Sequence, residues 1–315
     1  MTAPLLGALG LVLSLLVPKV LAKARWPARA PQAAVVLWQC VTLASVLSAV
    51  GVVLAAPEQV SRAVGAGQRT VVWILLGTLA VAALIVLRLL LSLFEVTRHA
   101  RARRDRHRML VDLLDRAEEH GDLNLVVPSD RLRVLDGAVP FAYCLPGRLP
   151  RVVLSGGTLQ VLAPEQVAAV LAHEQAHLRA RHDLVMEAFT ALHRALPKSL
   201  RSRTSLDAVH LLLEMLADDV ARRRFGAEPL HAALTTMGGA GDALVASTRV
   251  EADGRDGDAE RRRRLERLAP GTERAVLPLA VLQSAVYALG LSVLVLPTVV
   301  LVVPWMTRAL MDWPL

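Results

Sequence analysis

Two histidines and a glutamate have the spacing of a metal-dependent hydrolase. His173, Glu174 and His177 form the pattern His-Glu-x-x-His. Residues four apart on a helix lie on one face, so both imidazoles can bind a single metal ion. Glu174 then stands beside the metal, where a carboxylate can act as general base towards a water molecule. The alternative is that the two histidines share a surface helix by chance.

A catalytic zinc usually has three protein ligands and one open position, so a third ligand is required. His182 is one candidate, but its spacing differs from that of metzincins and the turn-making glycine is absent. Glu214 is the stronger candidate because it lies within the apolar stretch 211–216, where a carboxylate needs a partner such as a dication. We therefore predict a zinc site formed by His173, His177 and Glu214.

The segment around Glu214 carries further polar residues at helical spacing. Asp218 follows one turn later on the same face and can accept the second ring N–H of a zinc-bound histidine. His210 precedes Glu214 by one turn; it reaches the substrate side of the metal or, as we favour, bonds within the fold. Asp219 is expected to be solvated or paired with an arginine of the same helix.

The flanking sequence predicts the elements that hold these residues. Pro164 and Glu165 suit a first helical turn, and an apolar stripe continues the helix over 164–180. Further helices are predicted over 186–196 and 205–224. The remaining expectations are a helix over 109–120, strands over 123–127 and 131–135, a hairpin of 139–145 with 151–154, a helical stretch over 229–248, and a polar linker over 251–264.

The composition indicates a membrane protein. Of 315 residues, 54% are hydrophobic and only 20% are charged. The apolar residues concentrate in runs long enough to span a bilayer, which predicts four transmembrane helices at 4–22, 33–56, 70–94 and 275–303, with a loop at 57–69 between the second and third. The two cysteines do not suggest a disulfide framework.

The distribution of charge predicts the orientation. The net charge is +8, and an arginine-rich segment follows the third run at 98–108. By the positive-inside rule, residues 95–274 form a cytoplasmic domain, while the N-terminus and the tail 304–315 lie outside the plasma membrane. Binding of nucleic acid or acidic lipid is the alternative explanation of the arginines. We favour the topological one and expect no direct contact with nucleic acid.

These motifs resemble the BlaR/MecR-type family of integral-membrane zinc metallopeptidases. The chain is more distantly similar to the HtpX and CAAX-prenyl type membrane proteases. The resemblance rests on the segments 140–143, 151–155, 162–167 and 171–179, on the Glu214-x-x-Ala217-Asp218 pattern, and on three apolar runs before the domain and one after it.

The resemblance implies an α-helical membrane protein with four transmembrane helices and an inserted, mainly α (α+β) zincin-like metalloprotease domain. His173, His177 and Glu214 would bind one Zn²⁺, Glu174 would be the general base, and Asp218 would orient a ligand or assist proton transfer. A strand within 143–154 would pair with extended substrate.

The resemblance also implies an endopeptidase acting at the cytoplasmic membrane face on a protein substrate such as a helix-turn-helix transcriptional repressor. The alternatives are HtpX-like quality control of membrane proteins and a non-enzymatic zinc-containing regulator. Sensor members carry an extracellular penicillin-binding domain after the last span, which this sequence does not contain, so direct sensing of β-lactams is not expected. The oligomeric state is left open, a homo-oligomer included.

Overall fold

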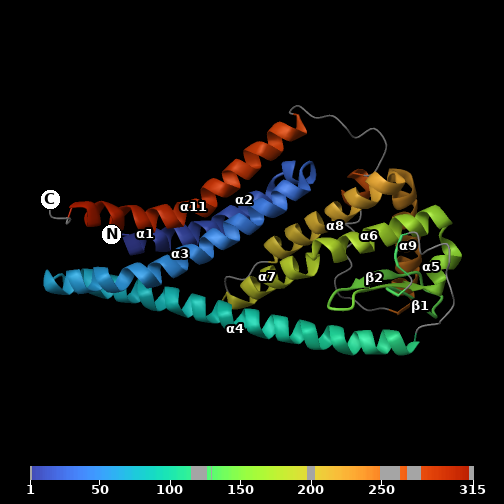
Figure 1. Ribbon diagram of the computed structural model, residues 1–315, viewed down its shortest axis with the longest axis horizontal. Coiled ribbons are helices and arrows are strands. Elements are labelled where there is room, and N and C mark those ends of the chain that lie inside the picture. Colours follow the sequence, from blue (N-terminus) through green and yellow to red (C-terminus); the bar gives the residue numbers. More distant parts are fainter. Residues whose placement is uncertain are drawn as a thin grey trace. The chain divides into compact units, whose positions relative to one another are not determined.

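The computed structural model describes residues 2–114, 126–128, 130–196, 203–248, 263–267 and 278–311. The chain divides into two compact units. The first unit draws on Met1–Glu95, Ala188–Val209 and Ala275–Leu315, and the second on Val96–Glu187 and His210–Arg274. Most of the described residues are helical, with a small sheet in the second unit (Figure 1).

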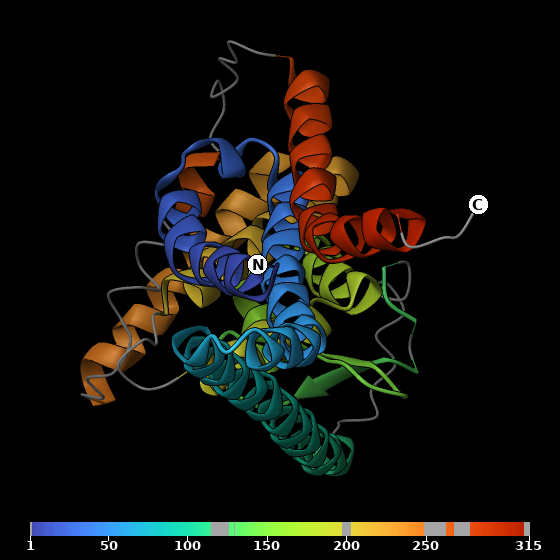
Figure 2. The ribbon, with the colours of Figure 1, turned by 90° about the vertical axis from the view of Figure 1, so that its left-hand side faces the viewer.

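The first unit is built from long apolar helices. Helix α3 (Pro31–Gly65) packs against α1 (Thr2–Leu11) and α11 (Leu279–Met311) (Figures 1 and 2). Small residues let α1 and α3 approach closely: a Cβ added at Gly51 would lie 3.0 Å from Leu6 Cδ1. A π-helical turn, η1 (Val12–Leu16), separates α1 from α2 (Val17–Lys23).

Four helices among the described residues are long and apolar enough to cross a membrane: Thr2–Lys23, Pro31–Gly65, Arg69–Leu114 and Leu279–Pro304. The predicted loop at 57–69 is wrong for most of its length, because α3 continues to Gly65 with Pro57 inside it. The continuation is stabilised by burial, since Ala63 belongs to the same apolar cluster as Leu6.

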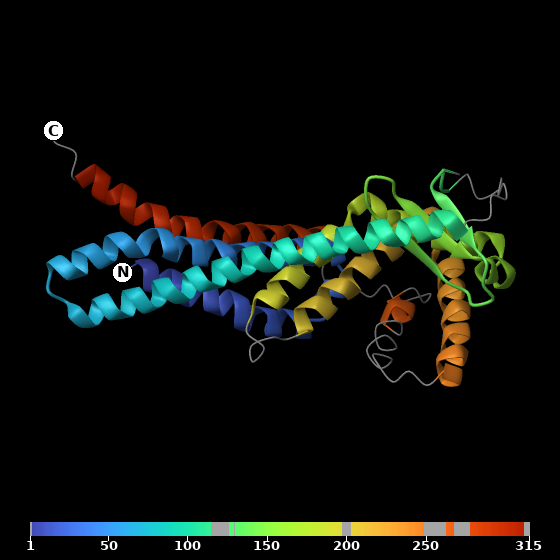
Figure 3. The same ribbon diagram turned by 90° about the horizontal axis from the view of Figure 1, so that it is seen from below.

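The arginine-rich segment 98–108 is also helical. It belongs to α4 (Arg69–Leu114), which is unbroken over 46 residues (Figure 3). At 1.5 Å per residue this helix is about 69 Å long, more than twice the thickness of a hydrocarbon core. The second half of the predicted helix 109–120 lies outside the described residues.

The second unit contains a three-stranded sheet within its described residues. Its order is β1 (Leu132–Leu135), β3 (Arg151–Ser155), β2 (Ala142–Leu145). Strands β2 and β3 pair antiparallel, as the predicted hairpin requires, and β1 pairs with β3 in parallel. The earlier predicted strand is not formed at Val126 and Val127, which lie in a turn and are buried in the core instead.

Five helices follow the sheet in sequence: α5 (Gly156–Val161), α6 (Pro164–Ala180), α7 (His182–Ala195), α8 (Thr204–Phe225) and α9 (Ala227–Thr248), of which the part 188–209 belongs to the first unit. Helix α6 has the predicted bounds, and Leu171 of α6 is fully buried in the cluster that contains Leu154 of β3. Helix α6 ends at Ala180 and is capped by Arg181, whose φ of 52° is left-handed, and α7 starts at once.

Gly157 in the first turn of α5 allows a close backbone approach that holds this corner of the second unit together. Its N–H donates to Gly137 O at 2.7 Å, and an added Cβ would lie 2.3 Å from Ala138 O. We expect Gly157→Ala to lower the free energy of unfolding by about 1–3 kcal/mol, because the backbone must shift. Gly156→Ala is the matched control, since its Cβ would meet nothing closer than 3.8 Å. Equal stability of the two variants in thermal unfolding would contradict the prediction.

Candidate metal centre

Helix α6 brings His173 and His177 to one face. His173 is buried and His177 is half-buried, and their Nε2 atoms lie 3.1 Å apart. Two nitrogens that each bind zinc at about 2.0–2.1 Å with tetrahedral angles are separated by about 3.3 Å. The spacing of the two imidazoles therefore suits a shared tetrahedral ion.

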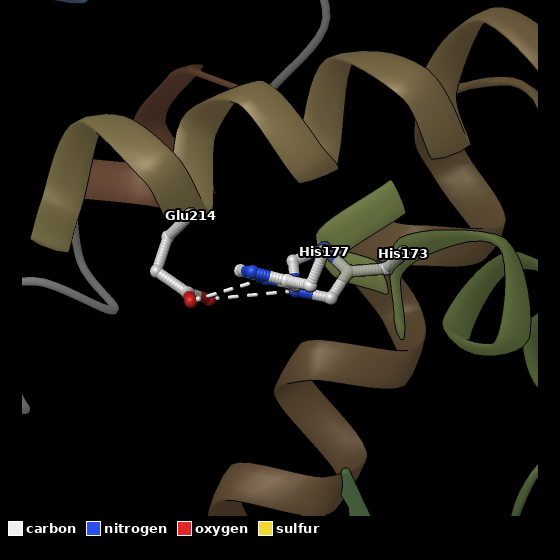
Figure 4. A group of neighbouring side chains, drawn as sticks. All are labelled: His173, His177 and Glu214. Carbon is white, nitrogen blue, oxygen red and sulfur yellow. Dashed lines mark hydrogen bonds and ion pairs between the residues drawn. The ribbon is translucent and has the colours of Figure 1, made fainter. Parts of the chain in front are cut away.

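Glu214 on α8 faces both imidazoles, as Figure 4 shows. Its Oε2 lies 3.4 Å from His173 Nε2, and its Oε1 lies 3.2 Å from His177 Nε2. Within the described part of the chain, these three side chains form the one group with the proximity of a metal-binding set, their donor atoms all within 4.8 Å of one another. Two imidazoles and a carboxylate are a donor set that zinc takes in catalytic sites.

The electrostatics of this group show strong coupling between its members. Burial alone would lower the pKa of His173, but hydrogen bonds to Asp218 and Glu214 outweigh it and raise the pKa to about 10. Burial would raise the pKa of Glu214, but hydrogen bonds from His173 and His177 hold that pKa well below its usual range. The half-buried carboxylate of Glu214 is thus ionised and can bind a cation.

Each predicted histidine ligand has a polar side chain within contact distance of its Nδ1 atom. Asp218 Oδ1 lies 3.0 Å from His173 Nδ1, and Asp218 is almost fully buried. His182 Nδ1 lies 2.9 Å from His177 Nδ1. A bond at Nδ1 fixes the ring and its tautomer and turns Nε2 towards the metal position.

The residue weighed as a third ligand from sequence, His182, thus stands behind His177 and outside the three-residue group. The left-handed Arg181 before it turns the start of α7 back towards α6. Burial, together with the nearby His177, lowers the pKa of His182 to about 4. His182 is neutral at pH 7, so one of its ring nitrogens is a free acceptor for the N–H of His177.

We expect the loss of this acceptor to weaken zinc binding. His182→Leu should raise the dissociation constant for zinc by about 10-fold or more, the usual effect of removing such a partner. His182→Asn places a carbonyl oxygen near the position of Nδ1 and should retain most of the affinity. Competition with a chromophoric chelator measures both variants. Equal affinities of the leucine and asparagine variants would show that His182 does not orient His177.

Glu174 is half-buried on α6 next to His173, and a thiol that the sequence did not single out lies beside it. Cys144 of β2 forms a side-chain hydrogen bond with Glu174. Burial first, and then the charge of Glu174, raise the pKa of Cys144, so this cysteine is a neutral thiol. Strand register explains the placement, because Cys144 and Tyr143 point to opposite faces and Tyr143 contacts His107 of α4.

A cavity of about 220 Å³ opens beside the metal position. It lies next to His177 and Glu214, and its remaining wall includes Cys144, Met186, His210 and Leu213. His210 thus lines the cavity, and its role stays a prediction. The other polar residue of this region, Asp219, pairs with Arg222, as expected, and also with Arg267.

The segment 263–267 contributes a residue that the sequence analysis assigned to a polar linker. It is helical, and Arg264 contacts the carboxylates of both Glu214 and Asp218. The linker prediction is therefore wrong at Arg264, because buried carboxylates on α8 provide partners that an isolated arginine run does not reveal. Residues 251–262 of that linker lie outside the described residues.

Comparison with known proteins finds a related family over part of the chain. No solved structure matches the chain. Residues 100–217 match the family described as Peptidase family M48. The matched segment includes His173, Glu174, His177 and Glu214 and ends one residue before Asp218. Peptidases of this family depend on zinc, so the match supports a metalloprotease domain in a chain that also carries four candidate membrane-spanning helices.

Proposed function

We propose that the chain is a membrane-anchored zinc endopeptidase with His173, His177 and Glu214 as metal ligands. The observation that carries the proposal is the proximity of the three donor atoms, one from each residue, which all lie within 4.8 Å of one another and suit a tetrahedral site with one position open. The side chains that contact His173 Nδ1 and His177 Nδ1 support it further. A non-enzymatic zinc module needs no open cavity next to the metal, whereas a peptidase does.

Zinc, when bound, would supply a Lewis acid that polarises the scissile carbonyl and lowers the pKa of water. Glu174 takes a proton from the attacking water while the oxygen of that water forms a bond to the carbonyl carbon. The same carboxyl group then gives the proton to the leaving amine as the C–N bond breaks. Asp218 and His182 keep the imidazoles in place during both steps, and the thiol of Cys144 donates to the Glu174 carboxylate before substrate enters.

Strand β2 is the element best suited to hold the substrate backbone. It lies at the edge of the sheet order β1-β3-β2, so one side of its backbone is not paired with another described strand. An extended peptide can add to such an edge through main-chain hydrogen bonds. Cys144 of this strand lies beside both Glu174 and the cavity, so a peptide on the β2 edge would bring its carbonyl close to the general base.

The proposal also includes the orientation in the membrane and the class of substrate, both argued from the sequence. The positive-inside rule favours a cytoplasmic position for the second unit at the plasma membrane, with the N-terminus outside. The substrate is then a cytosolic protein or a cytosolic segment of a membrane protein, and the resemblance to BlaR/MecR-type peptidases favours a helix-turn-helix repressor. A topology reporter inserted within residues 251–264 tests the orientation, and an extracellular signal from it would contradict the cytoplasmic placement.

New protein N-termini in cells test the function directly. Cells that produce the native chain should contain a small set of N-termini that are absent from cells producing Glu174→Gln. One cleaved regulator would support regulatory proteolysis, and many cleaved membrane proteins would support quality control instead. Identical sets of N-termini in the two strains would contradict a peptidase.

A further inference from the structure

A short helical segment supplies two arginines to the carboxylates of α8. In Arg263–Arg267, the side chains of Arg264 and Arg267 are only 12% and 18% exposed. Arg267 Nη2 donates to Asp219 Oδ2 at 2.8 Å, and its Nη1 donates to Met215 O at 3.2 Å. These bonds anchor the segment along α8, beside the predicted metal centre.

Arg264 contacts two carboxylates of the centre at once. Its Nε and Nη2 donate to Asp218 Oδ2 and Oδ1 at 2.9 and 2.7 Å, a bidentate pair. Its Nη1 lies 2.8 Å from Glu214 Oε2. The planar fork of a guanidinium is suited to such an arrangement, whereas the point charge of a lysine is not.

The contact continues to the histidine ligand. Asp218 Oδ1, which accepts from Arg264, also lies 3.0 Å from His173 Nδ1. Arg264 therefore fixes the carboxylate that fixes His173, and at the same time it restrains Glu214. Ligating carboxylates are commonly held by hydrogen bonds to their second oxygen, and Glu214 Oε1 still faces His177.

Charge balance gives an independent argument. Glu214, Asp218 and Asp219 stand within about one turn of α8, and Asp218 and Asp219 are buried. Burying several carboxylates together is unfavourable unless cations compensate them. In the described residues, Arg264 and Arg267 bring two positive charges to these three groups, and Arg222 brings a third to Asp219.

We propose that Arg264 is a positioning residue of the metal centre, which holds Asp218 and Glu214 in the orientation that zinc binding requires. The proposal rests on the proposed function, since it assumes that the three-residue group binds zinc. The opposite role is an inhibitory one, in which the guanidinium occupies Glu214 in place of the metal. Two of the three Arg264 contacts described above go to Asp218, outside the predicted ligand set, which favours positioning over competition.

Zinc affinity distinguishes these roles without measuring activity. The full chain, purified in detergent, is compared with Arg264→Gln and Arg264→Lys by competition with a chelator, and each apo-protein is checked by thermal unfolding. We expect Arg264→Gln to bind zinc about 10–100-fold more weakly and Arg264→Lys to fall between it and the native chain. Arg263→Gln is the matched control, because Arg263 is exposed, and it should bind as the native chain does.

A second measurement separates positioning from a general structural role. If Arg264 acts through Asp218, the losses of zinc affinity caused by Arg264→Gln and Asp218→Asn should be less than additive in the double variant. Unchanged affinity in a folded Arg264→Gln, or in Arg264→Lys if the glutamine variant does not fold, would overturn the proposal. Tighter binding would overturn it in favour of competition. Failure of the native chain itself to bind zinc would instead reject the proposed function.

Discussion

Replacing Glu174 by glutamine should lower the peptidase rate by about 10²–10⁴-fold and leave zinc bound. The amide has almost the shape of the carboxylate but cannot take a proton from water. Glu174 is outside the three-residue group that suits the metal, so its change should not disturb the ligands. Hydrolysis of a peptide spanning the cleavage site found in cells gives the rate, and metal analysis of the purified chain gives the zinc content.

Glu165→Gln is the matched control for this variant. Glu165 lies in the first turn of the same helix and is exposed, so its change should leave both rate and zinc content at the native values. If Glu174→Gln kept its zinc and hydrolysed the peptide at the native rate, Glu174 would not be the general base. Loss of zinc in this variant would instead make Glu174 part of the metal site.

The sequence was informative wherever local spacing decides the structure. His173 and His177 lie on one face of α6 because helical periodicity requires it, and the pattern around Pro164 predicted the start of that helix correctly. Glu214 was found because a single carboxylate in an apolar helix needs a partner. The structure brings it to within 3.4 Å of the two histidines, although its zinc-binding role stays a prediction.

The remaining features depend on tertiary contacts that spacing does not encode. Helix α4 continues through its arginines because arginine is a good helix former once a helix is under way. Cys144 lies beside Glu174 because of the register in which β2 pairs with β3. A hairpin pattern in the sequence does not fix this register, and a shift by one residue would turn Cys144 to the other face of the sheet. Arg264 lies about fifty positions from Asp218 in sequence, and three neighbouring arginines give it no distinguishing pattern.

Replacing Glu214 by alanine should abolish stable zinc binding and, with it, peptidase activity. Two imidazoles then remain, one ligand fewer than catalytic zinc sites use. The change also leaves Arg264 and His173 with one buried anionic partner fewer, so the apo-protein should unfold at a lower temperature than the native apo-protein. In the native chain, zinc at about 1,000 times its dissociation constant should stabilise the fold by about 4 kcal/mol.

The decisive comparison is therefore the shift of the unfolding temperature on addition of zinc. The native chain should show a clear increase, and Glu214→Ala should show none, whatever the stability of its apo-form. Glu228→Ala, at an exposed position in the first turn of α9, should keep the native response. Zinc raises the unfolding temperature only if it binds the folded state. If Glu214→Ala bound one zinc per chain and its unfolding temperature rose as much as that of the native chain, another side chain would have to complete the site.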